Sequence, residues 1–250
     1  MDIAERIALG VVDAERKRRE RVVGAEVLEI DGYVLALSNQ PDPALNGVMV
    51  EHEPEDALGS LHLVESECVR RGHPLGVNLQ RGRHPRVDAA VRSLGLALLM
   101  ERPAMAVDPV DLPDAPLPPG AEIRPVTTDV DVGALVAVGV AAFGDDPAVG
   151  SAFYGAGARG VDGVRTFVAW EGDDPVGIAA GYLVREAVSV MGVAVVPEAR
   201  RRGIGAALTV HAAKSFRSGL AWLHPSEMAR PLYEGLGFSV VSDWEIWVRG

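Results

Sequence analysis

The sequence predicts an α+β fold built in two parts. In both halves of the 250-residue chain, short apolar stretches of strand length alternate with longer stretches of helical periodicity. Tight-turn sequences such as Asp31-Gly32 and Gly172-Asp173-Asp174 join several of the short stretches, which favours hairpins. Between the halves, residues 108–120 contain five prolines, which exclude a helix or a central strand. We therefore expect a first domain at 1–107, a stiff linker at 108–120 and a second domain at 121–250.

In the first half, apolar residues of 3–21 recur at helical spacing, and the basic residues near its end suit a helix C-terminus. Asp31-Gly32 separates two strands, while Pro54 and Gly72 mark the start and end of a second helix. The expected order is helix 3–21, strands 25–30, 33–38 and 47–50, helix 54–71, strand 75–79, helix 84–94 and strand 97–107.

In the second half, Thr128 can cap a helix whose first turn contains Asp129 and Asp131. A later helix lies between Gly205 and Gly219. The expected order is strand 121–125, helices 129–143 and 147–155, strands 165–171, 175–184 and 187–196, the helix after Gly205, strand 220–223, helix 226–234, and a closing hairpin of strands 238–242 and 245–248.

Composition narrows the classes of function. The formal net charge of −11 argues against nucleic-acid binding, because proteins that bind phosphate backbones are usually basic. The single cysteine, Cys68, excludes an internal disulfide and fits a reducing compartment. No apolar run reaches the roughly 18 residues of a membrane helix, and Asp2, Glu5 and Arg6 are unlike the start of a signal peptide. We expect a cytoplasmic protein that binds neither nucleic acid nor membrane.

A strand, a basic turn and a helix at residues 193–208 predict an anion site. The apolar strand ends at Pro197, three consecutive arginines follow, and a helix then begins beside Gly203 and Gly205. The first amides of a helix have no intrahelical acceptor, and the helix dipole adds partial positive charge to them. The two glycines let the backbone approach a bulky anion. The expected ligand is a phosphate or a pyrophosphate, and the alternative is a basic surface turn.

Three kinds of site use such a turn. A P-loop needs a lysine after its second glycine, and none is present here. A dinucleotide fingerprint needs a third small residue where Leu208 stands, and an acidic residue where the chain reads Leu223-His224-Pro225. The third pattern, Arg/Gln-x-x-Gly-x-Gly/Ala after a Val-x-Val strand, is matched by residues 200–205. This stretch resembles the acyl-CoA pyrophosphate loop of the GNAT N-acetyltransferase family.

A second motif strengthens the resemblance. Residues 232–238 read Leu-Tyr-Glu-Gly-Leu-Gly-Phe, similar to the family motif Leu-Tyr-x-x-Leu-Gly-Phe, and the element order of 121–250 is also that of the family. The resemblance implies a mixed, mostly antiparallel central sheet flanked by helices. It also implies acetyl-CoA as cosubstrate and direct transfer of the acetyl group to a primary amine in a ternary complex.

The resemblance assigns roles to individual residues. The backbone of Val193, Ala194 and Val195 would bind pantetheine, with Gly192 permitting a β-bulge just before them. Tyr233 would donate a proton to the departing thiolate. The other cofactor-binding residues would be Arg200, Arg201, Arg202, Gly203, Ile204, Gly205, Ala206 and Ser226.

The helix expected at 226–234 has its own features. Ser226 would cap it, and Met228, Leu232 and Leu236 would form its buried stripe. Pro231 predicts a kink or a late start of this helix.

The general base is less well defined. Many family members have a glutamate on the strand before the loop, but residues 187–192 contain no carboxylate. His224, at the end of the neighbouring strand, could act directly or through water, although a structural role fits it equally well. No metal is expected, because an acidic surface turn explains Glu51, His52, Glu53 and Glu55 better than a ligand set does.

The first half resembles a degenerate copy of the second. Val48-Met49-Val50 takes the place of the 193–195 strand, and Ser93-Leu94-Gly95-Leu96 that of 235–238. Acidic residues at 51–56 replace the arginines and would repel a pyrophosphate. We expect this copy to bind no CoA and to act as a scaffold, a substrate-site wall or a dimerisation surface, which leaves a homodimer open.

Two functions therefore remain. The first is an N-acyltransferase that moves an acetyl group from acetyl-CoA to a small-molecule or peptide amine. The second is a catalytically weak CoA-binding or scaffold protein of the same fold. The missing strand carboxylate favours the second function, whereas the intact Arg/Gly loop together with Tyr233 favours the enzyme. An NAD-dependent enzyme is disfavoured by Leu208 and by the absent acidic residue.

Overall fold

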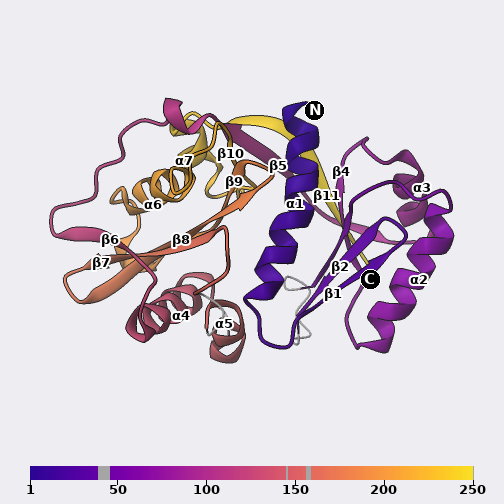
Figure 1. Ribbon diagram of the computed structural model, residues 1–250, viewed down its shortest axis with the longest axis horizontal. Helices are drawn as coiled ribbons and strands as arrows, with labels where there is room; N and C mark the ends of the chain where they lie inside the picture. The colour runs from indigo at the N-terminus through magenta and orange to yellow at the C-terminus, as the bar shows by residue number, and fades with distance from the viewer. Residues whose placement is uncertain (39–45, 145, 156–158, 250) are drawn as a thin grey trace. The chain divides into compact units, whose positions relative to one another are not determined.

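The computed structural model describes residues 1–250 except 39–45, 145, 156–158 and 250. The chain forms two compact units, each a mixture of helices and a largely antiparallel sheet, which confirms the predicted α+β class (Figure 1). The first unit contains residues 1–19, 24–104 and 240–250, and the second contains residues 20–23 and 105–239.

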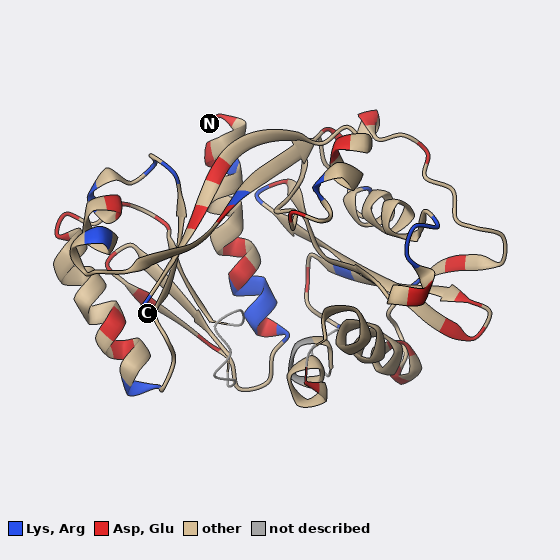
Figure 2. Ribbon diagram, turned by 180° about the vertical axis from the view of Figure 1, so that it is seen from behind, with Lys and Arg blue, Asp and Glu red and all other residues tan. Residues whose placement is uncertain are grey.

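Among the described residues, strands of the first unit pair in the order β1 (Glu26–Ile30), β2 (Tyr33–Leu37), β3 (Gly47–Val50), β4 (Gly76–Gln80) and β11 (Ser239–Val248), and only β3 and β4 are parallel. Residues 97–104 of β5 also belong to this unit. Its core contains Tyr33, Leu61 and Trp247, which come from β2, α2 and β11. Basic residues gather in the last turn of α1 (Figure 2). The elements of this half are α1 (Ile3–Glu20), β1 (Glu26–Ile30), β2 (Tyr33–Leu37), β3 (Gly47–Val50), α2 (Ala57–Arg70), β4 (Gly76–Gln80), α3 (Pro85–Ser93) and β5 (Ala97–Val107).

The second unit has the strand order β6-β7-β8-β9-β10-β5, and again one pair, β9 and β10, is parallel. The elements of this half are β6 (Ala121–Pro125), α4 (Asp129–Phe143), α5 (Pro147–Tyr154), β7 (Val164–Glu171), β8 (Asp174–Val184), β9 (Ala187–Val195), α6 (Ile204–Ala213), β10 (Ala221–Leu223), α7 (Arg230–Gly235) and β11 (Ser239–Val248). The closing hairpin expected after residue 238 is wrong, because β11 runs unbroken through residues 239–248.

Helices cover both faces of the second sheet (Figure 1). On one face, α6 and α7 contribute Leu208, Tyr233 and Leu236 to the main core cluster. On the other face, α4 contributes Leu135 and its neighbours to a second cluster. The predicted cap of α4 is confirmed, because the Thr128 hydroxyl accepts a hydrogen bond from the Asp131 amide in a reciprocal capping box.

Each unit takes one strand segment from the other half of the chain. Residues Met105–Val107 at the end of β5 pair with β10, whereas Trp244–Val248 of β11 pair with β4. The division expected at 108–120 takes no account of this exchange. The exchange results from strand pairing. The unpaired backbone groups at a sheet edge can pair with any strand that lies beside them, whatever its place in the sequence.

The exchange generates a prediction about folding. A chain of residues 121–250 lacks Met105, and a chain of residues 1–107 lacks Trp247, although both residues are buried core members. Removing one large core side chain costs about 3–5 kcal/mol, against a total stability of about 5–15 kcal/mol. We expect neither piece to show a cooperative thermal transition by circular dichroism.

The matched control restores the missing strand to the first unit. Residues 1–104 joined to 240–250 by a flexible linker contain the whole first unit, so this chain should melt cooperatively. A cooperative transition of 121–250 near the melting temperature of the intact chain would contradict the importance of the exchange.

Candidate cofactor and active site

The strand before the basic loop carries a bulge. Ile178 of β8 pairs with Ala194 of β9, and Ala180 of β8 pairs with Met191 of β9. The two pairs are two residues apart on β8 but three residues apart on β9. One extra residue therefore lies in β9, at Gly192, whose φ is +62°. The β-bulge expected at this glycine is confirmed. A bulge redirects the backbone groups that follow it, which are those of residues 193–195.

The pairing of β9 with β10 stops before the bulge, at Ser189. The two strands share only two register pairs, Ala221 with Val188 and Trp222 with Ser189. In the part of the chain that the structure describes, no strand pairs with residues 193–195 on the β10 side. Backbone donors and acceptors at this edge can bind an extended ligand as an added strand.

The three arginines of the loop have different environments. Arg200 donates to the carbonyl oxygens of Val195 at 3.0 Å and Ala142 at 3.2 Å, so it stabilises the turn itself. Arg202 forms an ion pair with Glu171, at the end of β7, with a closest N···O distance of 2.7 Å. Arg201 is exposed, has a φ of +64°, and has no hydrogen-bond partner among the described residues. Its charge is therefore the most accessible to a ligand.

Sequence reasoning did not single out Glu171. A carboxylate at the end of a strand that pairs with β6 and β8 carries no motif. Its contact with Arg202 depends on the tertiary packing of the loop against β7.

The N-terminus of α6 is left open. Gly203 precedes the helix with a φ of +87°, and among the described residues no side chain caps the amides of the first turn. A left-handed backbone favours glycine, because a Cβ atom there collides with the following carbonyl. Ile204 is buried and Ala206 packs against the core, which anchors the first turn. The open amides and the helix dipole favour an anion at this end.

Tyr233 is held rigidly on α7. It is 6% exposed, packs edge-to-face on Phe238 with ring centroids 5.9 Å apart, and belongs to the main core cluster. Burial raises the pKa of Tyr233 to about 12, so the phenol keeps its proton throughout the neutral range. No hydrogen bond of its hydroxyl group occurs among the described residues.

The helix α7 starts later than the range 226–234 expected from the sequence. The helix begins at Arg230, with Pro231 in its first turn, which confirms the late start. Ala229 is therefore the N-cap, and Ser226 instead accepts a hydrogen bond from the Ala229 amide in the preceding turn. Met228, expected in a buried stripe, is 80% exposed. It precedes the first residue of the helix, so it does not lie on the buried helix face with Leu236.

His224 lies directly after β10, in the half-buried region next to the opening between the strands. Its imidazole packs edge-to-face on Trp222, with ring centroids 5.8 Å apart. This contact fixes the ring near the end of β10. The geometry is compatible with both roles considered for it, structural or as a base acting through water.

The loop before α2, which the sequence predicts to correspond to the arginine loop, is closed by its own carboxylates. The Asp56 side chain caps α2 by accepting a hydrogen bond from the Gly59 amide at 2.9 Å. Glu51 pairs with Arg16 of α1 at 2.9 Å. The helix N-terminus that α6 leaves open is thus already occupied by an anion in α2.

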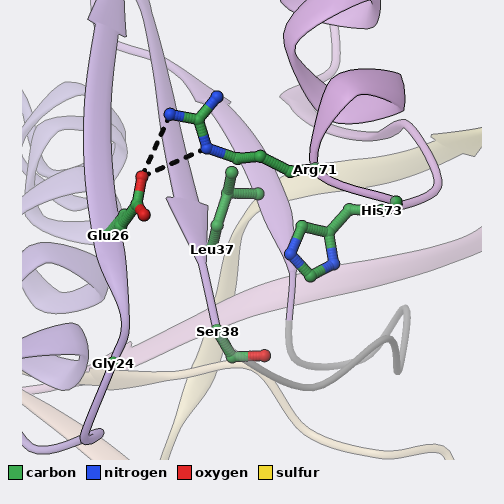
Figure 3. Close-up of a pocket in the computed structure, with 7 residues that line it drawn as sticks. Gly24, Glu26, Leu37, Ser38, Arg71 and His73 are labelled. Carbon is green, nitrogen blue, oxygen red and sulfur yellow. Dashed lines mark hydrogen bonds and ion pairs between the residues drawn. The ribbon is translucent and has the colours of Figure 1, made fainter.

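Two hollows lie away from these residues. One of about 360 Å³ in the first unit is bordered by Arg71 and His73, but Arg71 already pairs with Glu26 (Figure 3). Arg71 also pairs with Glu67. The other, of about 750 Å³, lies beside α6 and is bordered by Phe167 and His211. Neither is lined by Tyr233 or by the arginine loop. Within the described ranges, no group of three or more His, Cys, Asp or Glu residues could hold a metal ion.

A family model matches the stretch that contains these residues. Residues 162–240 match the family model described as an acetyltransferase (GNAT) domain. Residues 162–240 form a GNAT domain. The matched stretch contains β7 to β10, the arginine loop, α6 and α7, so the GNAT domain includes every candidate catalytic and cofactor-binding residue. The search of curated proteins gives no match to the chain.

Solved structures share the fold of the whole chain. A GCN5-related N-acetyltransferase from Kribbella flavida is 22% identical, with a TM-score of 0.77 over 99% of this chain and 96% of that one. A GCN5-related N-acetyltransferase from Sphaerobacter thermophilus is 16% identical, with a TM-score of 0.62 over 88% and 80%. A tandem GNAT protein from the clavulanic acid biosynthesis pathway is 15% identical, with a TM-score of 0.61 over 87% and 78%. At these identities the likeness establishes the fold. None of the described helices is long and apolar enough to cross a membrane.

Two glycine substitutions in the GNAT domain separate folding from binding. Gly203→Ala should lower stability by about 1–2 kcal/mol, because alanine is strained at a φ of +87°. Gly205→Ala should leave stability unchanged or raised, because the new Cβ would meet Leu232 and Val195 only at 3.6 and 3.7 Å. Thermal unfolding measures both effects.

Binding of acetyl-CoA should respond differently. Gly205→Ala places a methyl group in the first turn of α6, so we expect its affinity in calorimetry to fall by about tenfold or more. Full affinity in Gly205→Ala would show that the pyrophosphate does not approach this turn.

Proposed function

We propose that the GNAT domain transfers an acetyl group from acetyl-CoA to a primary amine of a small molecule or peptide. The observation that carries the proposal is the open, glycine-led N-terminus of α6 beside the unpaired edge of β9. The first feature suits a pyrophosphate and the second suits an extended pantetheine arm. Both occur in the stretch that matches the family model.

The cofactor would lie along the strand and end at the helix. Residues 193–195 would bind pantetheine through their backbone, and the amides of residues 203–206 would bind the pyrophosphate together with Arg201. Arg200 and Arg202 would hold the loop in shape, because their guanidinium groups contact the protein itself. Ser226 is exposed and would contact the cofactor from the turn before α7.

The chemistry is a substitution at the thioester carbonyl. The amine nitrogen forms a bond to the carbonyl carbon, the carbon–sulfur bond breaks, and one amine proton passes to a base. A backbone amide of Val193 or Ala194, next to the bulge, would stabilise the developing oxyanion. The protonated Tyr233 would give its proton to the leaving thiolate, and His224 would remove the amine proton through water.

A second candidate function keeps binding without turnover. Residues 187–192 of β9 contain no carboxylate to serve as a base, which favours a CoA-binding or scaffold protein. Both functions require acetyl-CoA binding, but only the acetyl transfer releases free thiol.

The chain should therefore bind one acetyl-CoA. In the first unit, Asp56 already accepts a hydrogen bond from the first turn of α2, and Glu51 is paired with Arg16. No open helix amides with an accessible arginine beside them are found among the described residues of that loop. Calorimetry of the intact chain should give a stoichiometry near one acetyl-CoA per chain. The double variant Arg201→Gln with Gly205→Ala should show no acetyl-CoA binding. A second site that persists in this double variant would show that the first unit also binds CoA.

Tyr233→Phe tests the transfer itself. Loss of a general acid typically costs about 10²–10⁴-fold in rate, so thiol release from acetyl-CoA with an amine panel should fall by about that amount. Because the pKa of Tyr233 is raised to about 12, the loss should be the same across the neutral pH range.

The matched control is Tyr33→Phe. Tyr33 is buried in the first unit and donates to the Ala57 carbonyl at 3.0 Å, so its loss should cost about 1 kcal/mol of stability. Thiol release should be unchanged. Equal activities of Tyr233→Phe and the unmodified protein would exclude the proton-donor role, and no thiol release from the unmodified protein would favour the second function.

A further inference from the structure

A row of polar side chains crosses the sheet of the second unit on the face that α4 covers. Tyr182 of β8 pairs with Ser189 of β9, which pairs with Trp222 of β10. The neighbours of Ser189 and Trp222 along their strands belong to the cluster on the α6 face. Because side chains alternate along a strand, the three residues of the row point to the opposite face.

Arg21 lies on this row. It is 5% exposed, and its Nη1 donates a hydrogen bond to the Tyr182 hydroxyl. Its guanidinium carbon is 5.7 Å from the centroid of the Tyr182 ring. The Nε and Nη2 atoms are buried and have no hydrogen-bond partner among the described residues. These two atoms form the parallel donor edge with which arginine binds a carboxylate through two hydrogen bonds.

A buried guanidinium without a carboxylate partner is costly. Within the part of the chain that the structure describes, no Asp or Glu pairs with Arg21, whereas the partly buried Arg16 pairs with both Glu29 and Glu51. A purely structural role therefore explains Arg21 poorly. A ligand that brings a negative charge would offset the cost.

The rest of the row also presents unused polar atoms. Ser189 Oγ and Trp222 Nε1 are buried and have no hydrogen-bond partner among the described residues. Both can donate, as Arg21 can. Trp222 also contacts His224, which places one end of the row next to the opening between β9 and β10.

We propose that Arg21 binds a carboxylate of the acceptor amine, with Ser189 and Trp222 as further donors. This inference rests on the proposed acetyl transfer and names its substrate class. Ser189 lies three residues before the bulge at Gly192, about 10 Å along a strand that rises about 3.3 Å per residue. The acceptor is therefore a primary amine whose carboxylate is several bonds from the nitrogen, such as an ω-amino acid or a short peptide.

The experiment uses matched pairs of amines. 6-Aminohexanoate, 8-aminooctanoate and triglycine, whose extended chains approach this separation, are each compared with their carboxamides in the presence of saturating acetyl-CoA. The shift in melting temperature reports binding and thiol release reports transfer. In the unmodified protein, we expect the carboxylate members to bind and react, and the carboxamides to do so more weakly by about 10- to 100-fold.

Substitutions then assign the preference to Arg21. Arg21→Gln and Arg21→Lys should remove it, because neither side chain offers two parallel donors on one rigid plane. The exposed Arg217→Gln is the control and should retain it. If Arg21→Gln does not fold, Arg21→Lys and Tyr182→Phe provide the same test, since Tyr182→Phe removes the hydroxyl that fixes Nη1.

The outcomes separate the two proposals. Binding of no carboxylate member, or an unchanged preference in Arg21→Gln and Arg21→Lys, would overturn the inference. Carboxylate binding that depends on Arg21 without any thiol release would support the carboxylate site and overturn the acetyl transfer. Thiol release with carboxamides as readily as with carboxylates would support transfer and overturn the site.

Discussion

The separation of β9 from β10 is the constraint on which the candidate site depends. The two strands are hydrogen-bonded at only two register pairs, and the bulge at Gly192 then turns the backbone of β9. Backbone groups that a neighbouring strand would otherwise satisfy are left for a ligand. The same separation places His224 and the row that contains Trp222 at the edge of the opening. In the proposed reaction, cofactor and acceptor would meet where the sheet is incomplete.

The two halves of the chain show how one local change decides whether a helix N-terminus is capped or left open. In α6 the preceding residue is Gly203, whose backbone is left-handed and which has no side chain to cap the helix. In α2 the preceding residue is Asp56, whose carboxylate already accepts a hydrogen bond from the first turn. An internal carboxylate satisfies the amides and repels an external phosphate. The difference is local, so it is visible in the sequence.

Features that depend on long-range pairing were harder to anticipate. Residues 239–248 have strand character, but only the fold shows that they form one continuous strand beside β4. The spacing of Met228, Leu232 and Leu236 suits a helix, yet the helix begins only at Arg230 and Met228 is exposed. Arg21 carries no signal of its own, because it follows a basic helix end in which similar residues are solvated or paired.

By itself, the sequence determined the α+β class, the strand–loop–helix unit at 193–208, the bulge at Gly192 and the late start of α7. These follow from local rules: periodicity, the φ angles open to glycine, and the missing amide hydrogen of proline. Only the tertiary structure decided which strands complete each sheet, that Arg202 pairs with Glu171, and that Arg21 is buried against Tyr182. The reason is physical, because pairing and burial depend on which segments meet in space, and sequence spacing does not encode that.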